Sequence, residues 1–563
     1  MFPFLARKDS FRTMSGTEAM DPAGQPKPRY PDFQDHLAEL EARGLLRRVD
    51  RAINKDTELH PLVRWQFQGG LSESQRTAFL FTNVTDSAGR SYDMPVAVGA
   101  LATTPEIYAL GMGVTVEEIG EKWLHAIANP IPPMRIDKAP CQEVVIEGKA
   151  LTSGKGLEML PVPISTPGYD AAPYLVATLV ITEDPETGVR NMGTYRGALK
   201  ASDRLGVRMA TRVGGAGGYL HWQKYQARGE PMPCAIAIGV PPAVAYSGPQ
   251  KLAVGQDEMA VAGGVVGAPI RVVKAVTVDL EVPADAEIVV EGFIDTELLE
   301  PEGPFGESHG YVALEDFNMS MKVTAITRKR SPVFASIVSQ VTPSESSVLK
   351  RVAYEPLFLA HLKDELRVQG ILSVTMHEPL TNIRPVIFLR FEDNTPCEEI
   401  WRGLEGASTL QAQCGKIVIA LSSDIDPLNT DAIFWSLAYR MNPVDDLRIV
   451  TGRKRGHGPK GNQGEESGIL VDATRKEKMM PLALPEKEYM ENARAIWEEL
   501  NLPELSPSVP WFGYAMGDWS DTWESFARNA VEGRWAENGA QTEQRKRGGM
   551  VPETPARLVE GDE

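Results

Sequence analysis

The spacing of apolar residues near the N-terminus predicts a helix. Phe33, Leu37 and Leu40 recur at helical intervals, as in a helix that buries one face. Gly44 follows them and predicts where the helix ends. The mixed pattern that continues to about residue 138 predicts an α/β region.

The central part of the chain, from about residue 142 to 343, has a different pattern. Short apolar segments with alternating polar residues, such as 272–280 and 322–326, are separated by Gly and Pro turns. A series of strand-like segments separated by turns predicts a β-rich domain, which we interpret as a barrel.

After residue 346 the pattern alternates between helical and strand-like segments. A helical stretch through Leu349, Phe358, Leu359 and Leu362 precedes three apolar runs, at residues 372–376, 386–391 and 417–421. Alternation of this kind predicts a third, α/β domain.

The segment from about residue 485 onward carries five of the chain's ten tryptophans, in a context broken by Pro and Gly. They are Trp497, Trp511, Trp519, Trp523 and Trp535. So much aromatic surface is unusual in a loose tail. Two interpretations remain open: the rings pack on their own domain, or they dock on a neighbouring subunit as an oligomerisation element.

Together these patterns predict a multidomain α+β or α/β protein, and the length of 563 residues supports two or three domains. The predicted segments are a disordered extension (1–30), an N-terminal α/β domain (31–138), a central β-barrel domain (139–343), a C-terminal α/β domain (344–484), the Trp-rich tail (485–540) and a disordered end (541–563). An alternative for the extension is a translation start assigned too early, because Met14 and Met20 offer later ones.

Composition narrows the class of protein. The net charge of −18 disfavours nonspecific binding to nucleic acid or to an anionic membrane. The four cysteines lack the paired spacing of zinc sites and disulfide frameworks, and reduced thiols are typical of the cytosol. No apolar run approaches the roughly 18 residues of a membrane span, and no signal peptide follows the basic N-terminus. We therefore expect a cytoplasmic protein without nucleic-acid or membrane partners.

The most informative motif is residues 302–311, Glu-Gly-Pro-Phe-Gly-Glu-Ser-His-Gly-Tyr. Its Gly-Pro-Phe-Gly core cannot continue a regular helix or a central strand. Glu302 and Glu307 are therefore expected where the chain changes direction, a common place for catalytic groups. Two neighbouring carboxylates are suited to acid/base catalysis, because they resist ionising together. Solvent-facing turn glutamates are the simpler alternative.

A second motif is residues 191–196, Asn-Met-Gly-Thr-Tyr-Arg. A strand candidate at 174–182 and turn-forming residues at 183–188 precede it. We interpret the three segments as a hairpin whose second strand carries Arg196.

Taken with the segments 231–242 and 287–292, these two motifs give the chain a resemblance to the UbiD-like decarboxylases, which use prenylated FMN. The resemblance extends from about residue 31 to residue 480 in order and spacing. It implies that the central domain is a split β-barrel that holds prenylated FMN, which a prenyl-FMN synthase would supply.

The resemblance also places the family's Arg-Glu-Glu triad on Arg196, Glu302 and Glu307. Arg196 would clamp a carboxylate, and Glu302 would orient the guanidinium. Glu307 would deliver a proton to carbon after CO2 leaves, and the flavin would be the electron sink.

The resemblance is incomplete at the cofactor phosphate. In the family a divalent metal, usually Mn²⁺, with K⁺ beside it, bridges protein and phosphate through an asparagine, a histidine and a glutamate. Asn191 matches the asparagine, but Ala216 and Arg271 stand where the histidine and the glutamate are expected. Gly468 replaces a lysine that the family often supplies in the third domain.

Three explanations remain open. We favour direct pairing of Arg271 with the phosphate, helped by backbone N–H groups of the glycine run that includes Gly214, Gly215 and Ala216. Alternatively, a local gap brings His221 into a weaker metal site with Asn191. In the third, the chain does not bind flavin productively and serves as a partner subunit, although the intact triad argues against this.

The predicted activity is reversible, non-oxidative decarboxylation of an aromatic or α,β-unsaturated acid, or of an aryl-CoA acid, by a homo-oligomer such as a dimer or hexamer. The basic run at 453–460 would contact a phosphate of flavin or coenzyme A, or would form a solvated loop. Alternatives are a non-catalytic subunit of a larger carboxylase complex and an oxidoreductase with ordinary FMN. No Gly-x-Gly-x-x-Gly run that opens a helix supports a dinucleotide site.

Overall fold

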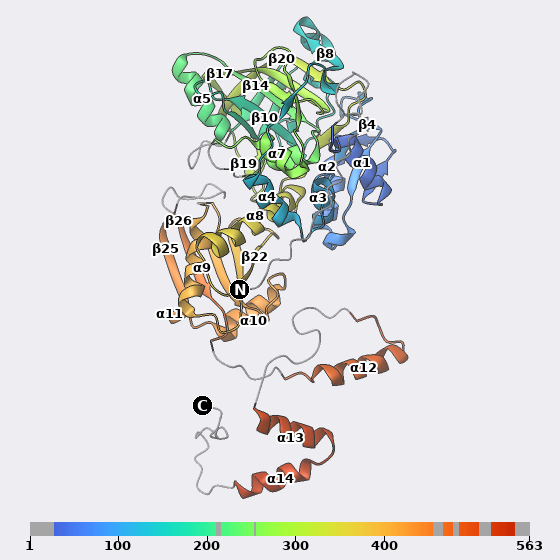
Figure 1. Cartoon of the computed structure of the whole chain (residues 1–563). Coiled ribbons are helices and arrows are strands. Elements are labelled where there is room, and N and C mark those ends of the chain that lie inside the picture. Colours follow the sequence, from blue (N-terminus) through green and yellow to red (C-terminus); the bar gives the residue numbers. More distant parts are fainter. Residues whose placement is uncertain are drawn as a thin grey trace, which may run out of the picture.

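The computed structural model describes residues 28–209, 216–250, 252, 255–411, 413–453, 466–476, 483–505 and 520–545. Among these residues three sheet-bearing regions follow one another along the chain, and three further helices lie in the tail (Figure 1). This is the multidomain α+β architecture that the sequence predicts, whereas the exact domain boundaries remain a prediction.

The predicted N-terminal helix is present as α1 (Phe33–Ala42). Phe33, Leu37 and Leu40 are buried, and the side chain of Asp32 caps the helix by accepting from the N–H of Asp35. The further elements of this region are β1 (Leu46–Val49), β2 (Ile53–Asn54), α2 (Leu59–Gln68), β3 (Ala78–Phe81), β4 (Val84–Thr85), β5 (Ser91–Tyr92), β6 (Val96–Val98), α3 (Pro105–Met112), α4 (Ile119–Ala128) and β7 (Met134–Arg135).

A strand from much later in the chain completes the N-terminal sheet. The strand order is β1-β3-β6-β21, and β21 (Phe334–Ser336) pairs in parallel with β6. The N-terminal and central regions are therefore joined by backbone hydrogen bonds as well as by packing.

The central region is dominated by one large sheet with the strand order β11-β10-β14-β17-β20-β13-β12-β9, and β8 pairs with β20. Its strands are β8 (Val144–Glu147), β9 (Tyr174–Leu175), β10 (Thr178–Glu183), β11 (Arg190–Gly193), β12 (Arg196–Ala201), β13 (Arg204–Arg208), β14 (Met232–Ile238), β17 (Ile288–Glu302) and β20 (Asp316–Arg328). In the described residues β11 and β9 do not pair, so the strands form an open path and not a closed barrel.

Smaller elements surround this sheet. They are α5 (Gly217–Arg228), α6 (Pro242–Ser247), α7 (Glu258–Val266), β15 (Arg271–Lys274), β16 (Glu281–Pro283), β18 (Phe305–Gly306) and β19 (Val312–Ala313). Residues 272–280, expected to form one strand, instead form the end of β15 and the connection to β16, with which β15 pairs.

The predicted hairpin is correct in outline but wrong in one detail. β10 and β11 pair around the turn at 183–188, with Thr182 opposite Asn191. Arg196 lies on the following strand, β12, which pairs with β9 and β13. The chain therefore turns between Gly193 and Arg196, because β11 and β12 lie at different ends of the sheet path.

The C-terminal region confirms the predicted alternation of helices and strands. Its five-stranded sheet has the order β22-β23-β24-β26-β25, in which β23, β24 and β26 are parallel. The elements are α8 (Glu345–Ala360), β22 (Ile371–Met376), β23 (Val386–Phe391), α9 (Cys397–Thr409), β24 (Ile417–Ser422), α10 (Thr430–Arg440), α11 (Pro443–Asp446), β25 (Leu447–Arg453) and β26 (Glu466–Asp472).

The tail contains α12 (Lys487–Glu499), α13 (Asp521–Val531) and α14 (Trp535–Gln544). Trp497 is 36% exposed and Trp535 70% exposed, and Trp523 contacts Phe526 edge-on. Trp511 and Trp519 lie outside the described residues, so both interpretations of the tail remain open. α14 continues into the range predicted to be disordered, whereas residues 1–27 and 546–563 lie outside the described residues. No helix in the described part of the chain is long and apolar enough to cross a membrane.

A buried carboxylate connects the N-terminal region to the start of α8. Glu345 is completely buried, and it accepts the backbone N–H groups of Gly99 (2.9 Å), Leu101 (2.9 Å) and Ala102 (3.4 Å). Burial raises the pKa of Glu345 to about 7. The loop before α3 therefore depends on a side chain about 245 residues away in sequence for its hydrogen bonds.

We expect Glu345→Ala to lower the free energy of unfolding by about 3 kcal/mol, because it leaves buried N–H groups without an acceptor. Urea unfolding followed by circular dichroism would measure this loss. Glu365→Ala, at an exposed glutamate just beyond the same helix, is the matched control and should change stability by less than about 0.5 kcal/mol. Equal stability of the two variants would contradict the role of Glu345.

Candidate active site

The two glutamates of the 302–311 motif lie on either side of a sharp change in chain direction, as the sequence predicts. Glu302 is the last residue of β17, and Gly303 follows with a φ of 112°, a conformation that favours glycine. The chain then forms the β18–β19 hairpin, in which the N–H of Glu307 donates to the carbonyl of Tyr311 at 3.0 Å. Glu302 is thus held by the main sheet and Glu307 by a turn.

Arg196 contacts both glutamates. Its guanidinium donates to Glu302 through Nε (2.8 Å) and Nη2 (2.9 Å), and to Glu307 through Nη1 (2.5 Å). The side chain of Arg196 is 9% exposed and that of Glu302 is 1% exposed, whereas Glu307 is 21% exposed. The two-pronged contact fixes the guanidinium. Glu307, held by a single bond, is freer to exchange partners.

Aromatic rings and an amide surround this ion pair. The Cζ atom of Arg196 lies 4.4 Å from the ring centroid of Phe305 and 5.7 Å from that of Tyr174, within cation–π range. The amide of Asn318 donates to Glu302 Oε2 at 3.2 Å. Burial and the charge of Glu302 raise the pKa of Tyr174, so its hydroxyl stays protonated.

Asp170 fixes the turn that carries Glu307. Its carboxylate accepts the N–H of Gly306 at 2.9 Å and that of Thr166 at 2.7 Å. A Cβ atom on Gly306 would lie 2.4 Å from Thr166 Oγ1, so the close approach of the two segments requires glycine. Burial raises the pKa of Asp170.

Arg208 is a site residue that the sequence reasoning missed. It lies on β13 directly opposite Arg196, with Nη1 3.8 Å from Glu307 Oε1 and 4.0 Å from Glu302 Oε2. The tight connection between β12 and β13 was the available signal, because residues paired across a short hairpin share one face of the sheet.

A second cluster lies around Asn191. Thr182 is its partner on β10, and Thr182 Oγ1 lies 2.9 Å from Nδ1 of His221. The amide of Asn191 donates to the hydroxyl of Tyr195 at 3.4 Å. Burial lowers the pKa of His221, so the imidazole is neutral at pH 7. Thr182 is therefore a neighbour of both Asn191, through strand pairing, and His221, through its side chain.

Glu258 belongs to the same cluster, and the sequence reasoning did not consider it. It opens α7, and its Oε2 accepts the N–H of Met192, the neighbour of Asn191, at 3.0 Å. Burial raises the pKa of Glu258 to about 7. Burial also raises the pKa of Tyr195, with a smaller contribution from the charge of Glu258. A carboxylate in such surroundings is stabilised in its ionised form by a cation.

The N-terminus of α5 completes this cluster. A Cβ atom on Gly217, the first residue of α5, would lie 1.9 Å from Asn191 Oδ1. Only glycine therefore lets the helix start so close to Asn191. Helix N-termini attract anions. Ala216 is the N-cap residue, and Gly214 and Gly215 lie outside the described residues.

The oxygen atoms and N–H groups of this cluster are of the kinds that bind a cation and a phosphate. Asn191 and Glu258 offer hard oxygen atoms, which Mn²⁺ accepts, and the start of α5 offers N–H groups to the anion. The described residues contain no group of three or more His, Cys, Asp or Glu side chains arranged for a metal. A cation at this cluster would consequently take its remaining ligands from phosphate and water.

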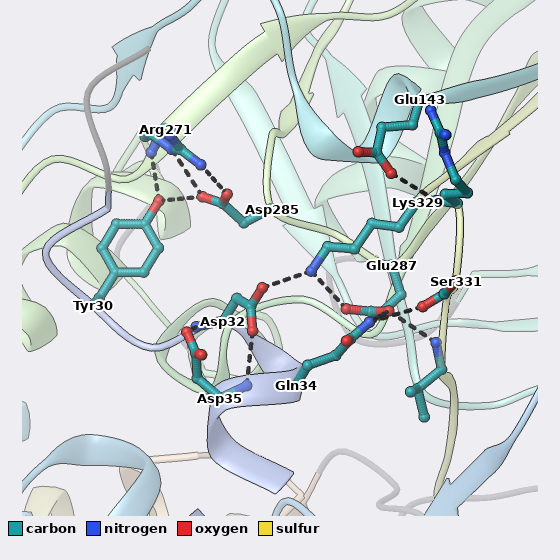
Figure 2. Close-up of polar contacts among 12 residues, drawn as sticks. Tyr30, Asp32, Gln34, Asp35, Glu143, Arg271, Asp285, Glu287, Lys329 and Ser331 are labelled. Atoms are coloured by element: carbon teal, nitrogen blue, oxygen red, sulfur yellow. Dashed lines mark hydrogen bonds and ion pairs between the residues drawn. The ribbon is translucent and has the colours of Figure 1, made fainter. Parts of the chain in front are cut away.

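Arg271, the residue in the position expected for a glutamate, is buried in an ion pair (Figure 2). Its Nε donates to Asp285 Oδ2 at 3.2 Å, and its Nη2 bonds to the other oxygen. The hydroxyl of Tyr30 donates to Asp285 at 2.9 Å and accepts the N–H of Arg271 at 2.8 Å. The charge of Arg271 is thus balanced within the protein, and its pairing with a phosphate remains a prediction.

A neighbouring network joins the cap of α1 to the central sheet. The Nζ atom of Lys329 lies 2.6 Å from Asp32 Oδ2 and 2.8 Å from Glu287 Oε1 (Figure 2). Glu287 also accepts from the amide of Gln34 at 2.7 Å. Both networks therefore stabilise the contact between the N-terminal segment and the central region.

The space beside Gly468 is filled from the neighbouring strand. A Cβ atom on Gly468 would lie 2.8 Å from Cδ of Arg453. Arg453 in turn donates to the carbonyls of Ser408 (2.8 Å) and Cys414 (2.5 Å). A lysine at position 468 would displace Arg453. Residues 454–460 of the basic run lie outside the described residues.

Comparison with known proteins agrees with the sequence resemblance. The chain matches the three domains of the 3-octaprenyl-4-hydroxybenzoate carboxy-lyase (UbiD) family: the N-terminal domain at residues 37–127, the Rift-related domain at 134–341 and the C-terminal domain at 348–473. The chain belongs to the UbiD family, whose members are decarboxylases.

Solved structures agree with this assignment. The UbiD-class enzyme HmfF from Pelotomaculum thermopropionicum, in complex with FMN, is 29% identical with a TM-score of 0.71, over 82% of this chain and 100% of that chain. An evolved dimeric form of HmfF, in complex with prenylated FMN (prFMN), is 29% identical with a TM-score of 0.69, over 81% and 97%. Vanillic acid decarboxylase of Sedimentibacter hydroxybenzoicus, 23% identical with a TM-score of 0.68 over 84% and 99%, shares the fold.

The raised pKa of Glu258 predicts a pH-dependent loss of stability in chelator-treated protein. Below pH 4.5 the carboxyl group is protonated in both the folded and the unfolded chain. Between 4.5 and about 7 the unfolded chain ionises first. The contribution of Glu258 to the free energy of unfolding therefore falls by an amount on the order of 2 kcal/mol as the pH rises to 8. Glu258→Gln, which keeps an acceptor for Met192, should be more stable than wild type at pH 8 and equal to it at pH 4.

Urea unfolding at several pH values would measure this difference. Glu297→Gln, at an exposed glutamate, should follow the wild-type curve. A constant difference between Glu258→Gln and wild type at every pH would show that Glu258 ionises normally.

Proposed function

We propose that this protein is a prenylated-FMN-dependent enzyme that reversibly decarboxylates an aromatic or α,β-unsaturated carboxylic acid. The observation that carries the proposal is the Arg196 guanidinium, fixed by both oxygens of buried Glu302 and bonded to Glu307. Membership of the UbiD family and the prFMN complex of HmfF support the cofactor and the reaction class. The open sheet around Arg196 is then interpreted as the family's split barrel.

In this proposal Arg196 orients the substrate carboxylate and Glu307 supplies the proton. The bond between carbon and carboxylate breaks, CO2 leaves, and a proton moves from the carboxyl group of Glu307 to that carbon. Glu307 is then ionised, which suits its 2.5 Å contact with Arg196. When bound, prFMN supplies an electrophilic carbon that accepts the electron pair left by CO2. The reverse order of the same events gives carboxylation.

The cluster of Asn191, Glu258 and the N-terminus of α5 is the proposed site for the flavin phosphate and a divalent cation. Asn191 and Glu258 would bind the cation, and the first N–H groups of α5 would face the phosphate. This arrangement competes with the hypothesis that Arg271 pairs with the phosphate, because Arg271 has a carboxylate partner in Asp285.

The first experiment is co-expression with a prenyl-FMN synthase and purification without oxygen, followed by cofactor mass, absorbance and metal analysis. A prenylated flavin together with CO2 release from a panel of aromatic and acrylic acids would support the proposal. A folded, oligomeric protein that contains no flavin would favour a partner-dependent or non-catalytic subunit.

Glu307→Gln should reduce turnover by roughly 10³-fold, because general acid catalysis typically contributes 10²- to 10⁴-fold. The flavin content of the Glu307→Gln enzyme should equal that of wild type. Glu315→Gln, at an exposed glutamate just after the same hairpin, should retain wild-type turnover measured by CO2 release. Comparable activity of the Glu307→Gln and wild-type enzymes would exclude Glu307 as the proton donor.

Gly217→Ala should weaken flavin retention by about tenfold or more, because its Cβ atom would overlap Asn191 Oδ1. Flavin fluorescence after gel filtration would measure retention. Gly539→Ala in α14, where a Cβ atom meets nothing within 4 Å, is the control. Full retention and an unchanged metal content in Gly217→Ala would place the phosphate elsewhere, and Arg271→Ala would then become the decisive variant.

A further inference from the structure

The active-site cluster contains a second guanidinium with hydrogen-bonding capacity to spare. Arg196 and Arg208 are direct partners in the antiparallel β12–β13 pair, so their side chains leave the same face of the sheet. Like charges in such positions repel one another. The pair is tolerated here because Glu302 and Glu307 lie between the two cations.

The two arginines differ in how far their donors are used. Three nitrogen atoms of Arg196 already donate to carboxylate oxygens. Arg208 lies 3.8 Å and 4.0 Å from its two glutamates, beyond hydrogen-bonding distance. Its guanidinium donates no hydrogen bond to any residue in the described part of the chain, and its side chain is 26% exposed. Arg208 is therefore the more available of the two for an incoming anion.

The charge balance of the cluster points to a monoanion. With Glu307 ionised, two arginines and two glutamates sum to zero. When Glu307 carries the proton that it is proposed to deliver, the sum becomes +1, which matches one carboxylate. Without Arg208 the protonated cluster would be neutral, and it would attract an acid no better than an amide.

Four titratable groups beside the cluster leave this sum unchanged. Asp170 interacts electrostatically with Arg196 and also with Arg64. The negative charge of Asp170 and the positive charge of Arg64 therefore offset one another. Burial lowers the pKa of His309, which also lies near the charges of Glu307 and Arg208. Its imidazole is therefore neutral at pH 7. The pKa of Tyr174 is raised, so the phenol is neutral too.

We propose that Arg208 binds the carboxylate of the acid substrate, releasing its electrostatic contact with Glu307 as it does so, while Arg196, held fixed by Glu302, orients that carboxylate. This assignment rests on the proposed decarboxylase function and deepens it. It makes Arg208 a residue that selects acids over neutral analogues.

The test uses the flavin-loaded, full-length enzyme and two acid–amide pairs, benzoate with benzamide and cinnamate with cinnamamide. Binding is measured by isothermal titration, which needs no turnover. Wild type should prefer each acid to its amide. Arg208→Gln should weaken acid binding by about ten- to a hundredfold and leave amide binding unchanged.

Two further variants separate charge from folding. Arg208→Lys keeps the charge and should recover part of the preference for acids. Arg204→Gln removes a positive charge from the same strand, where Arg204 pairs with Glu300, and should bind both ligands as wild type does. Flavin content and melting temperature would establish that each variant is folded.

Glu307→Gln mimics the protonated carboxyl group and should bind benzoate more tightly than wild type does. Adding Arg208→Gln should abolish this gain. Where a substrate is known, Arg208→Gln should raise KM by a similar factor and change kcat less.

Acid binding that is unaffected by Arg208→Gln, or no preference for acids in wild type, would overturn the inference. The protein could instead bind acids through Arg208 and decarboxylate none of those tested. That result would support the inference and count against the proposed activity. The inference about Arg208 and the proposed decarboxylase activity can therefore fail separately.

Discussion

The two-pronged ion pair between Arg196 and Glu302 is the interaction on which the site depends. Both side chains are almost completely buried, and a buried charge is tolerated only with a well-placed partner. The pair joins β12 to the end of β17, strands that are not neighbours in the sheet. It therefore links two strands of the sheet at the point where Glu307 and Arg208 converge, and Asn318 and the ring of Phe305 also contact the pair.

Local patterns predicted much of the fold. Helix α1 and strands β22, β23 and β24 lie where apolar spacing places them, because each buries one face or one short apolar run. The errors lie where tertiary pairing decides the outcome. Apolar residues continue from β15 toward β16 without a visible break, and the chain between β11 and β12 carries no strong turn signal although the two strands take different neighbours.

Part of the candidate site could also be predicted from the sequence. The triad could be proposed because its residues lie in two recognisable motifs, and the structure brings them together. Glu258 and Arg208 have no such context: one is a first-turn glutamate of a helix and the other the last residue of a strand. What gives them chemical significance is contact with residues distant in sequence, Met192 for Glu258 and Glu307 for Arg208. Such contacts follow from the assembled sheet and not from local spacing.

The pairing of β21 with β6 has a consequence for how this chain is made. The N-terminal sheet lacks its last strand until the ribosome has released Phe334–Ser336, more than 200 residues after β6. During synthesis β6 has an open hydrogen-bonding edge, the kind of surface that invites mispairing. The central strands emerge in that interval, so they fold beside an unfinished neighbour. α8 begins at Glu345, only nine residues after the strand that completes the sheet, so the last region starts to emerge soon after the first region can be completed.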